Sequence, residues 1–182
     1  MKPSIPKGTR DFTPYEVYLR NFVKEKIKLN FELFGFEPIE TPSFEKIEVI
    51  GGEYVNDGEQ LIFKILSNGK KLSKADLDSF NNQNYSKFAN SISEKALRYD
   101  LTVPFSRYVV QHQNEITLPF KRYQIQTVWR ADRPQYGRFQ EFLQCDADII
   151  GSKSLWQEIE LCLLYDKIIK DLGLKGVSLR IN

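Results

Sequence analysis

Two segments of alternating polarity, residues 120–130 and 139–150, constrain the fold of this chain more than any other feature. Side chains on a β-strand point to opposite faces in turn, so such alternation predicts strands with one face in a core. In the second segment the odd positions are mostly apolar, namely Phe139, Glu141, Leu143, Cys145, Ala147 and Ile149. The even positions are polar with one aromatic residue, namely Gln140, Phe142, Gln144, Asp146 and Asp148. We therefore predict a hairpin with an apolar face and a polar face.

The first segment repeats the pattern, with Tyr123, Ile125, Thr127 and Trp129 opposite Gln124, Gln126, Val128 and Arg130. A polar sheet face can simply meet water, but these faces combine acids, amides, an arginine and an aromatic rather than the usual Lys/Glu mixture. The connection at 131–138 is basic and longer than a two-residue turn, as is typical of a binding loop. A shorter strand predicted at 97–102 places Arg98, Asp100 and Thr102 on its polar side.

Helix signals occur at both ends of the chain. Thr13, Pro14 and Glu16 form a capping-box pattern that starts a helix, and Gly35 is a suitable stop. The proline-containing stretch 36–42 predicts an edge strand or an interface strand, because proline cannot donate to a ladder. Residues 154–172 predict a second amphipathic helix.

The remaining segments complete an α+β domain in which helices flank an antiparallel sheet. We predict a strand at 61–65, a polar surface insertion at 67–94 with one loose helix near 74–80, a helix at 103–113, and the start of a strand at 177–181. Because the chain ends inside that last element, we expect a truncated domain.

Composition excludes several classes of protein. The 26 basic and 24 acidic residues nearly cancel, so the net charge of +2 neither favours nor excludes nucleic acid. The single histidine, His112, has the position of a helix-rim residue, and the two cysteines have neither disulfide nor metal-ligand spacing. Without a long apolar run or a signal peptide, the chain is expected to be cytoplasmic, with no metal site of its own.

The polar groups on the predicted faces have complementary chemistry. Arginine suits a phosphate or carboxylate, and an aromatic ring offers a surface on which a base can stack. Carboxylates and amide oxygens accept hydrogen bonds from an ammonium or an imidazole N–H. Together these groups suggest that a zwitterion and a nucleotide bind side by side.

Four sequence strings support a specific resemblance. They are KGTRDFTP at 7–14, GFEPIETPSFE at 35–45, ALRYDLTVPFSRY at 96–108 and VWRADRPQYGRFQEFLQCDADIIG at 128–151. In order and spacing the chain resembles histidyl-tRNA synthetases, which are class II aminoacyl-tRNA synthetases. The resemblance implies motif 1 at about 20–45 and motif 2 at about 120–151 within a partial catalytic domain, 1–182. The family's motif 3 and anticodon-binding domain have no counterpart in this sequence.

The resemblance also implies a role for each of ten residues. The predicted ATP-binding residues are Arg130, Asp132, Arg138 and Phe142, of which Arg130 is also the catalytic residue. The predicted histidine-binding residues are Asp100, Thr102, Arg130, Gln144 and Asp148. The predicted contacts with the tRNA acceptor end are Arg133 and Gln135. Asp132 stands where many family members have glutamate, which shortens its reach toward adenine.

The implied protein is a histidine–tRNA ligase that uses ATP and Mg²⁺, charges tRNA(His) and forms a homodimer through motif 1. The fragment alone is expected to have little or no activity, because a catalytic arginine lies downstream in the family. The alternative is the synthetase-like regulatory subunit of ATP phosphoribosyltransferase, which binds histidine and charges no tRNA. Arg130, Arg138 and Phe142 favour the ligase, because a binding-only relative has little need of them.

Overall fold

The computed structural model describes residues 2–50 and 62–180 of the chain. The chain divides into two compact units. The first contains Met1–Thr9, Thr41–His112 and Thr127–Gln144, and the second contains Arg10–Glu40, Gln113–Gln126 and Cys145–Asn182. The long strands β5 (Phe120–Trp129) and β6 (Glu141–Ile150) pass through both units, and each unit is described here by itself.

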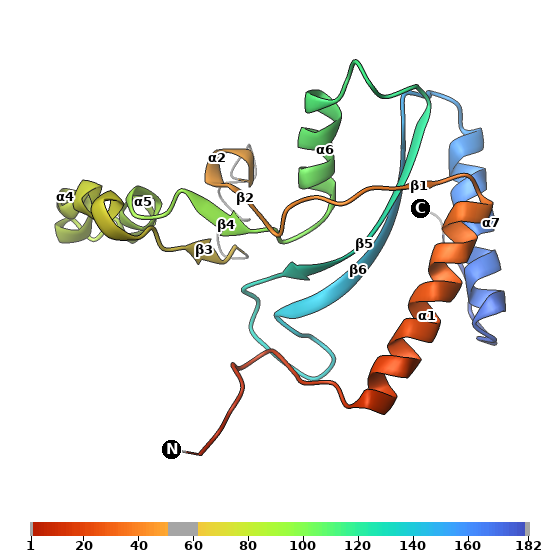
Figure 1. Cartoon of the computed structure of the whole chain (residues 1–182), viewed down its shortest axis with the longest axis horizontal. Coiled ribbons are helices and arrows are strands. Elements are labelled where there is room, and N and C mark those ends of the chain that lie inside the picture. Colours follow the sequence, from red (N-terminus) through yellow and green to blue (C-terminus); the bar gives the residue numbers. More distant parts are fainter. Residues whose placement is uncertain (1, 51–61, 181–182) are drawn as a thin grey trace. The chain divides into compact units, whose positions relative to one another are not determined.

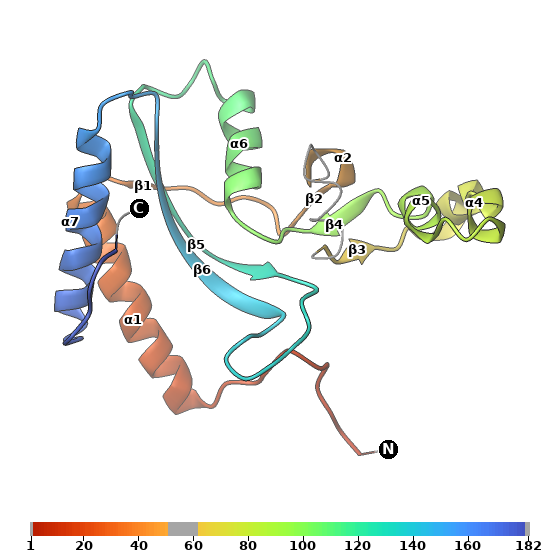
Figure 2. The same cartoon turned by 180° about the vertical axis from the view of Figure 1, so that it is seen from behind.

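The second unit packs two helices on one face of a sheet (Figures 1 and 2). Helix α1 (Pro14–Leu33) lies beside α7 (Trp156–Asp171), and the sheet order is β1-β5-β6, where β1 is Glu37–Pro38. Strand β1 is an edge strand, as its proline predicts, although its pairing with β5 is parallel. The short β1 therefore joins the sheet without a hairpin.

Helix α1 begins and ends where the sequence predicts. The Thr13 hydroxyl accepts a hydrogen bond from the Glu16 amide at 3.4 Å, and the Glu16 carboxylate accepts one from the Thr13 amide at 2.8 Å. These two bonds satisfy amide groups that lack a partner within the helix. After Leu33 the chain turns through Gly35, whose φ of +77° is open to glycine at little steric cost.

The apolar faces of β5 and β6 form the core of the second unit. Its buried members are Phe31, Phe36, Tyr123, Leu164 and Ile168, and Ile125, Cys145, Ala147 and Ile149 pack against them. The rings of Phe31 and Tyr123 have centroids 5.3 Å apart. The odd-numbered residues of both strands in this unit thus face the helices, which confirms the predicted apolar face.

The first unit contains a small antiparallel sheet of order β2-β4-β3, with β2 at Phe44–Lys46, β3 at Lys64–Ile65 and β4 at Lys95–Leu97. Helix α2 (Ile47–Ile50) follows β2, and helix α6 (Thr102–Gln111) follows β4. Of the strand predicted at 61–65, only Lys64 and Ile65 are in β3, and Leu61 lies outside the described residues.

The insertion at 67–94 is more helical than predicted. It holds the 3₁₀-helix η2 (Gly69–Lys74) and the short helices α4 (Leu77–Asn81) and α5 (Tyr85–Ser91). Side-chain caps account for the two α-helices, because Asp76 accepts from the Ser79 amide at 3.0 Å and Asn84 from the Lys87 amide at 3.1 Å. Both caps are residue types that favour helix starts, so the polar composition that predicts a surface loop here also contains helix-start signals.

Two predicted strands are wrong. Strand β4 stops at Leu97, and Thr102 already belongs to α6, where the Val103 amide in the first turn donates a hydrogen bond to the Asp100 carboxylate at 3.2 Å. Residues 177–180 form no strand, since none of the described strands pairs with them; Ile181 lies outside the described residues. In the described ranges, moreover, no helix has the length and apolar character needed to cross a membrane.

Candidate functional site

Arg130 follows directly after β5 and is held at three points. Its amide donates to the Gln140 carbonyl at 2.8 Å, which closes the end of the β5–β6 ladder. Its Nε donates to the Tyr99 carbonyl at 3.0 Å, and its guanidinium carbon lies 5.3 Å from the centre of the Phe142 ring. The guanidinium and the aromatic face are therefore neighbours, as a site for a phosphate and a stacked base requires.

The loop after Arg130 places its charged side chains in pairs. The Arg138 Nε lies 3.2 Å from an Asp132 carboxylate oxygen, so among the described residues the ion pair of Asp132 is with Arg138 and not with Arg130. Asp132 is half-buried whereas Arg138 is exposed, which leaves the cation open to a ligand. The geometry therefore does not support an ion pair between Arg130 and Asp132.

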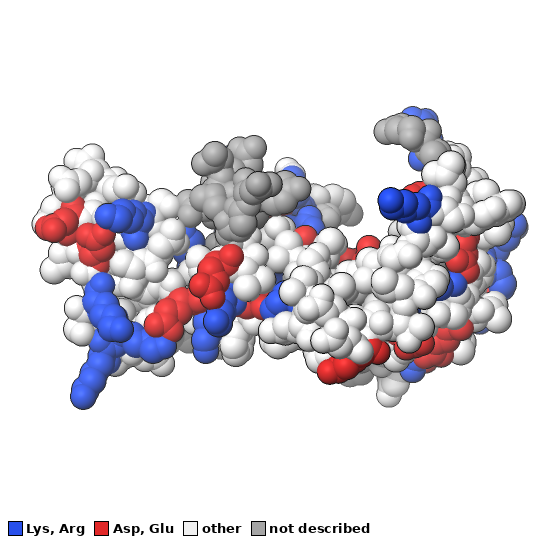
Figure 3. All heavy atoms as spheres, turned by 90° about the horizontal axis from the view of Figure 1, so that it is seen from above, with Lys and Arg blue, Asp and Glu red and all other residues white. Residues whose placement is uncertain are grey.

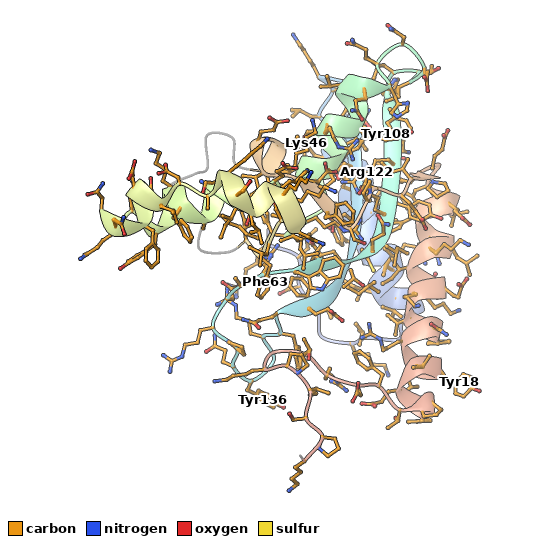
Figure 4. All side chains as sticks on the ribbon, turned by 60° about the vertical axis from the view of Figure 1, so that its left-hand side comes forward. Tyr18, Lys46, Phe63, Tyr108, Arg122 and Tyr136 are labelled. Atoms are coloured by element: carbon orange, nitrogen blue, oxygen red, sulfur yellow. The ribbon has the colours of Figure 1, made fainter. Side chains whose placement is uncertain are left out.

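The tip of the loop is a tight, exposed turn. Gln135 and Arg138 exchange backbone hydrogen bonds of 3.3 and 2.9 Å, and Gly137 between them has a φ of +74°. Tyr136 projects from this tip (Figure 4). Arg133 and Gln135 are also exposed, as residues that meet a large ligand at the loop must be.

The amino-terminal segment supports the base of the loop. The Gly8 carbonyl accepts from the Gln140 amide at 2.8 Å, and the Gln140 side-chain amide donates to the Asp132 carbonyl at 2.9 Å. A Cβ on Gly8 would lie 2.7 Å from the Gln140 side chain, and Gly8 has a φ of +84°. The KGTRDFTP string therefore contains a residue that secures motif 2, a role that the sequence analysis did not assign.

Three of the predicted histidine-binding residues lie in the first unit with Arg130. Asp100 is half-buried and accepts a hydrogen bond from the Val103 amide of α6, and Thr102 is the exposed first residue of that helix. The Gln144 side-chain oxygen is buried and accepts no hydrogen bond from a described residue. A buried amide oxygen without a donor costs free energy, so a ligand that supplies an N–H there would be favoured.

Not every arginine on a predicted polar face is available to a ligand. Arg98 is buried, and its guanidinium donates to the carbonyls of Thr41, Pro42 and Thr127 at 2.6, 3.1 and 2.9 Å. Because those carbonyls occupy its donors, Arg98 ties the segment before β2 to β5. Its role is structural.

The fifth predicted histidine-binding residue, Asp148, lies in the second unit and forms an ion pair with Arg122. The Arg122 side chain is fully buried on β5 (labelled in Figure 4), whereas that of Asp148 keeps 36% of its exposure. The sequence analysis did not single out Arg122. Its even position, shared with Gln124 and Gln126, places it on the polar face of β5, so the alternation pattern could have identified it.

The two strongest pKa shifts in the second unit belong to its core. Burial, assisted by the neighbouring Glu32 carboxylate, raises the pKa of Tyr123 to about 12. Burial also raises the pKa of the Cys145 thiol to about 11, with a smaller effect from Asp146. Cys145 therefore stays protonated near neutral pH and acts as a packing residue rather than a nucleophile.

A hollow of about 350 Å³ in the second unit lies away from the predicted site residues. Its walls come from α1, β1 and β5 and include Lys24, Glu32 and Tyr123, but none of the ten predicted site residues. The candidate site is therefore defined by its side-chain contacts and not by this hollow.

Comparison with known proteins decides the family. A model of the histidyl-tRNA synthetase family matches residues 78–182, which is more than half of the chain. The chain belongs to the histidyl-tRNA synthetase family. The matched range contains all ten predicted site residues, including the motif 2 string.

Similarity to a curated relative and to solved structures agrees with this assignment. The chain is 64% identical over 181 residues to the histidine–tRNA ligase of Christiangramia forsetii, covering 100% of this chain and 40% of that protein. It superposes on the crystal structure of histidyl-tRNA synthetase from Nostoc sp. PCC 7120 with a TM-score of 0.69 and 29% identity, covering 92% of this chain and 34% of that one. The predicted α+β class and class II fold are thereby confirmed.

A more distant structure shares the fold. It is an ATP phosphoribosyltransferase regulatory subunit/histidyl-tRNA synthetase from Bacillus halodurans C, with a TM-score of 0.73 and 24% identity, covering 96% of this chain and 40% of that one. The chain spans only part of these proteins, about 40% of the length of the Christiangramia forsetii ligase.

Proposed function

We propose that this chain forms the ATP- and histidine-binding part of a histidine–tRNA ligase. The observation that carries the proposal is the contact of Arg130 with Phe142, beside the Asp132–Arg138 pair, all within the first unit. These four residues are the ones that the family resemblance assigns to ATP. In that role Arg130 contacts the α-phosphate and the histidine carboxylate, Arg138 contacts the other phosphates, and Phe142 stacks on adenine.

Histidine would be recognised through Asp100, Thr102, Gln144 and Asp148. The first three would surround its ammonium group, and the unsatisfied Gln144 oxygen supports this assignment because an ammonium supplies N–H donors. Asp148 would accept a hydrogen bond from the imidazole. A site built to hydrogen-bond one substrate rejects analogues that lack the donor, because its own polar groups are then left unpaired.

The reaction has two steps. The histidine carboxylate attacks the α-phosphorus of ATP, so a C–O–P bond forms as pyrophosphate leaves with the electron pair of the broken bond. The 3′-terminal hydroxyl of tRNA(His) then takes the histidyl group and releases AMP. The carboxylate is already a nucleophile, so the first step needs alignment and charge stabilisation rather than a general base. Arg130 would supply both, and its hydrogen bond to the Tyr99 carbonyl supports this role because it restrains the guanidinium.

Mg²⁺ would arrive with the ATP phosphates and help to neutralise their charge. This ion keeps several waters and binds through one or two carboxylates plus phosphates rather than through an all-protein cage. Within residues 2–50 and 62–180 no group of three or more histidine, cysteine, aspartate or glutamate side chains gathers. We therefore assign no residue of this chain to hold the ion.

The exposed groups suit the larger partners. Arg133 and Gln135 would contact the acceptor end of the tRNA from the exposed loop tip. Helix α1 leaves apolar side chains exposed, among them Tyr15, Tyr18 and Leu33 at 70%, 73% and 70%, and Tyr18 points outward in Figure 4. Such a surface supports the proposed homodimer through motif 1 in a cytoplasmic enzyme.

Titration of ATP and histidine, separately and together, into the wild-type chain and two variants tests the nucleotide assignment. Arg130→Ala should weaken ATP binding about ten- to a hundredfold, because a hydrogen bond to a charged group contributes about 1.5–3 kcal/mol. Arg133→Ala removes the same charge from the adjacent loop and should leave ATP binding unchanged. Equal losses in both variants would mean that general loop charge, and not Arg130, binds ATP.

The same titration separates the ligase from a regulatory subunit that binds histidine alone. Histidine binding that is indifferent to ATP and to Arg130→Ala would favour the regulatory subunit. Histidine binding that strengthens with ATP in the wild-type chain and loses this dependence in Arg130→Ala would favour the ligase.

A further inference from the structure

The ion pair between Arg122 and Asp148 joins a fully buried side chain to a partly exposed one. The Arg122 side chain has 0% exposure, so its positive charge is fully removed from water. Burial of a charge costs several kcal/mol unless a partner and hydrogen bonds offset it. An exposed ion pair contributes little to stability. Here the Asp148 carboxylate offsets part of the cost of burying the Arg122 guanidinium.

The carboxylate of Asp148 presents its two oxygens differently. Oδ2, which faces the Arg122 guanidinium, is inaccessible to solvent, although the Asp148 side chain as a whole keeps 36% of its exposure. The exposed part therefore belongs to the other atoms of the side chain, which include Oδ1. One oxygen of the carboxylate is therefore buried against Arg122, while Oδ1 is not among the atoms buried without a hydrogen-bond partner.

The neighbours of Arg122 on β5 show that the two faces of the strand have different contacts. Gln124, also fully buried and on the same face, donates to the Gln126 side chain at 2.8 Å. The adjacent Lys121 has the opposite parity and pairs instead with Glu160 of α7, beside the apolar core. Lys121 and Arg122 therefore lie on opposite faces of β5. Of these two cations, Arg122 is the one that contacts a predicted histidine-binding residue.

We propose that Arg122 is a positioning residue for amino-acid specificity. It fixes the Asp148 carboxylate through Oδ2, so that Oδ1 is oriented to accept the imidazole N–H of histidine. This inference rests on the proposed function. Arginine suits the role because its planar fork restrains a carboxylate in orientation, whereas the flexible ammonium of lysine supplies the charge without that restraint.

Steady-state pyrophosphate exchange in a polypeptide of the relatives' full length that carries this sequence tests the proposal. Arg122→Lys should raise the KM for histidine roughly ten- to a hundredfold, the effect of one misaligned charged hydrogen bond, and leave kcat and the KM for ATP near their wild-type values. Lys121→Met is the matched control, because it breaks the neighbouring ion pair on the other face and should leave the KM for histidine unchanged.

Asp148→Asn provides a second variant in case Arg122→Lys folds poorly. It should produce the same selective rise in KM, and the double variant should be no worse than either single one, because both changes remove one interaction. Parallel losses for ATP and histidine, an equal effect of Lys121→Met, or no effect of Arg122→Lys would overturn the proposal. Absence of histidine-dependent exchange in the unsubstituted polypeptide would instead overturn the proposed function, and this inference with it.

Discussion

The helices of the second unit and those of the insertion are held by different means. Helices α1 and α7 have 20 and 16 residues and bury apolar side chains on β5 and β6. Helices α4 and α5 have five and seven residues, and neither has a buried apolar side chain. Their contacts include the caps at Asp76 and Asn84, a bond from the Asp76 amide to the Ser91 hydroxyl at 2.8 Å, and partly exposed aromatic rings around Phe80.

The difference shows which part of the chain carries the free energy of folding. Helices of fewer than about twelve residues are marginal in water, so α4 and α5 depend on local hydrogen bonds. Helices α1 and α7 depend instead on contacts between residues that are distant in the sequence. Lys70, Lys71, Lys74 and Lys87 of the insertion are exposed, as on a solvated surface. Figure 3 shows basic and acidic side chains on one face of the molecule. The insertion can therefore change without disturbing the sheet, whereas the helix–sheet core cannot.

The largest effect should come from the core. Leu164 is 1% exposed in the second unit, and Leu164→Ala should lower the free energy of unfolding by about 2–5 kcal/mol, because it deletes buried methyl groups and leaves a cavity. Urea unfolding followed by circular dichroism measures the change. Leu163→Ala, at a neighbouring position with 56% exposure, is the control and should change the stability little. Similar losses in both variants would mean that α7 does not pack as described.

A smaller effect should follow from loss of the α1 cap. Thr13→Ala removes the oxygen that accepts from the Glu16 amide and should cost about 1 kcal/mol in the same unfolding experiment. Thr13→Ser keeps the oxygen and should retain most of the stability. If the serine variant is as unstable as the alanine variant, the cap is not the cause.

The smallest effect should be a local response of the insertion to acid. Hydrogen bonds from the Ser79 side chain and backbone, and then from Lys87, lower the pKa of Asp76 below its ordinary value, to about 2. A depressed pKa in the folded state contributes stability that is present above the ordinary value and is lost as the pH falls through the folded value. The α4 cap should therefore persist at pH 5 and weaken progressively from about pH 4 to pH 2.

The amide shift of Ser79 measured by NMR during acid titration would report this loss of the cap. Asp76→Asn keeps an acceptor but does not titrate, so its Ser79 amide should not follow the same curve. A Ser79 titration midpoint near 4 in the native chain would show that the hydrogen bonds of Asp76 are not formed in solution.

Sequence patterns predicted the elements that depend on local chemistry or on alternation. The capping box set the start of α1, the glycine at 35 set its end, and parity assigned the residues of β5 and β6 in the second unit that pack against the helices. The four strings of family resemblance directed attention to Arg130, Arg138 and Phe142, and the structure places Phe142 beside Arg130. For these features the determining residues are neighbours in the chain.

Tertiary structure alone decided the roles of the charged side chains. Arg98 and Arg130 both look like ligand-binding arginines in the sequence, yet the donors of Arg98 are taken by three carbonyls, whereas Arg130 lies over Phe142. Likewise, the alternation pattern placed Arg122 and Asp148 on the polar face of the sheet. It did not indicate that Arg122 is buried and forms an ion pair with Asp148. The reason is physical: a residue type determines which bonds a side chain can form, but burial and the partners brought by distant segments determine which bonds it does form.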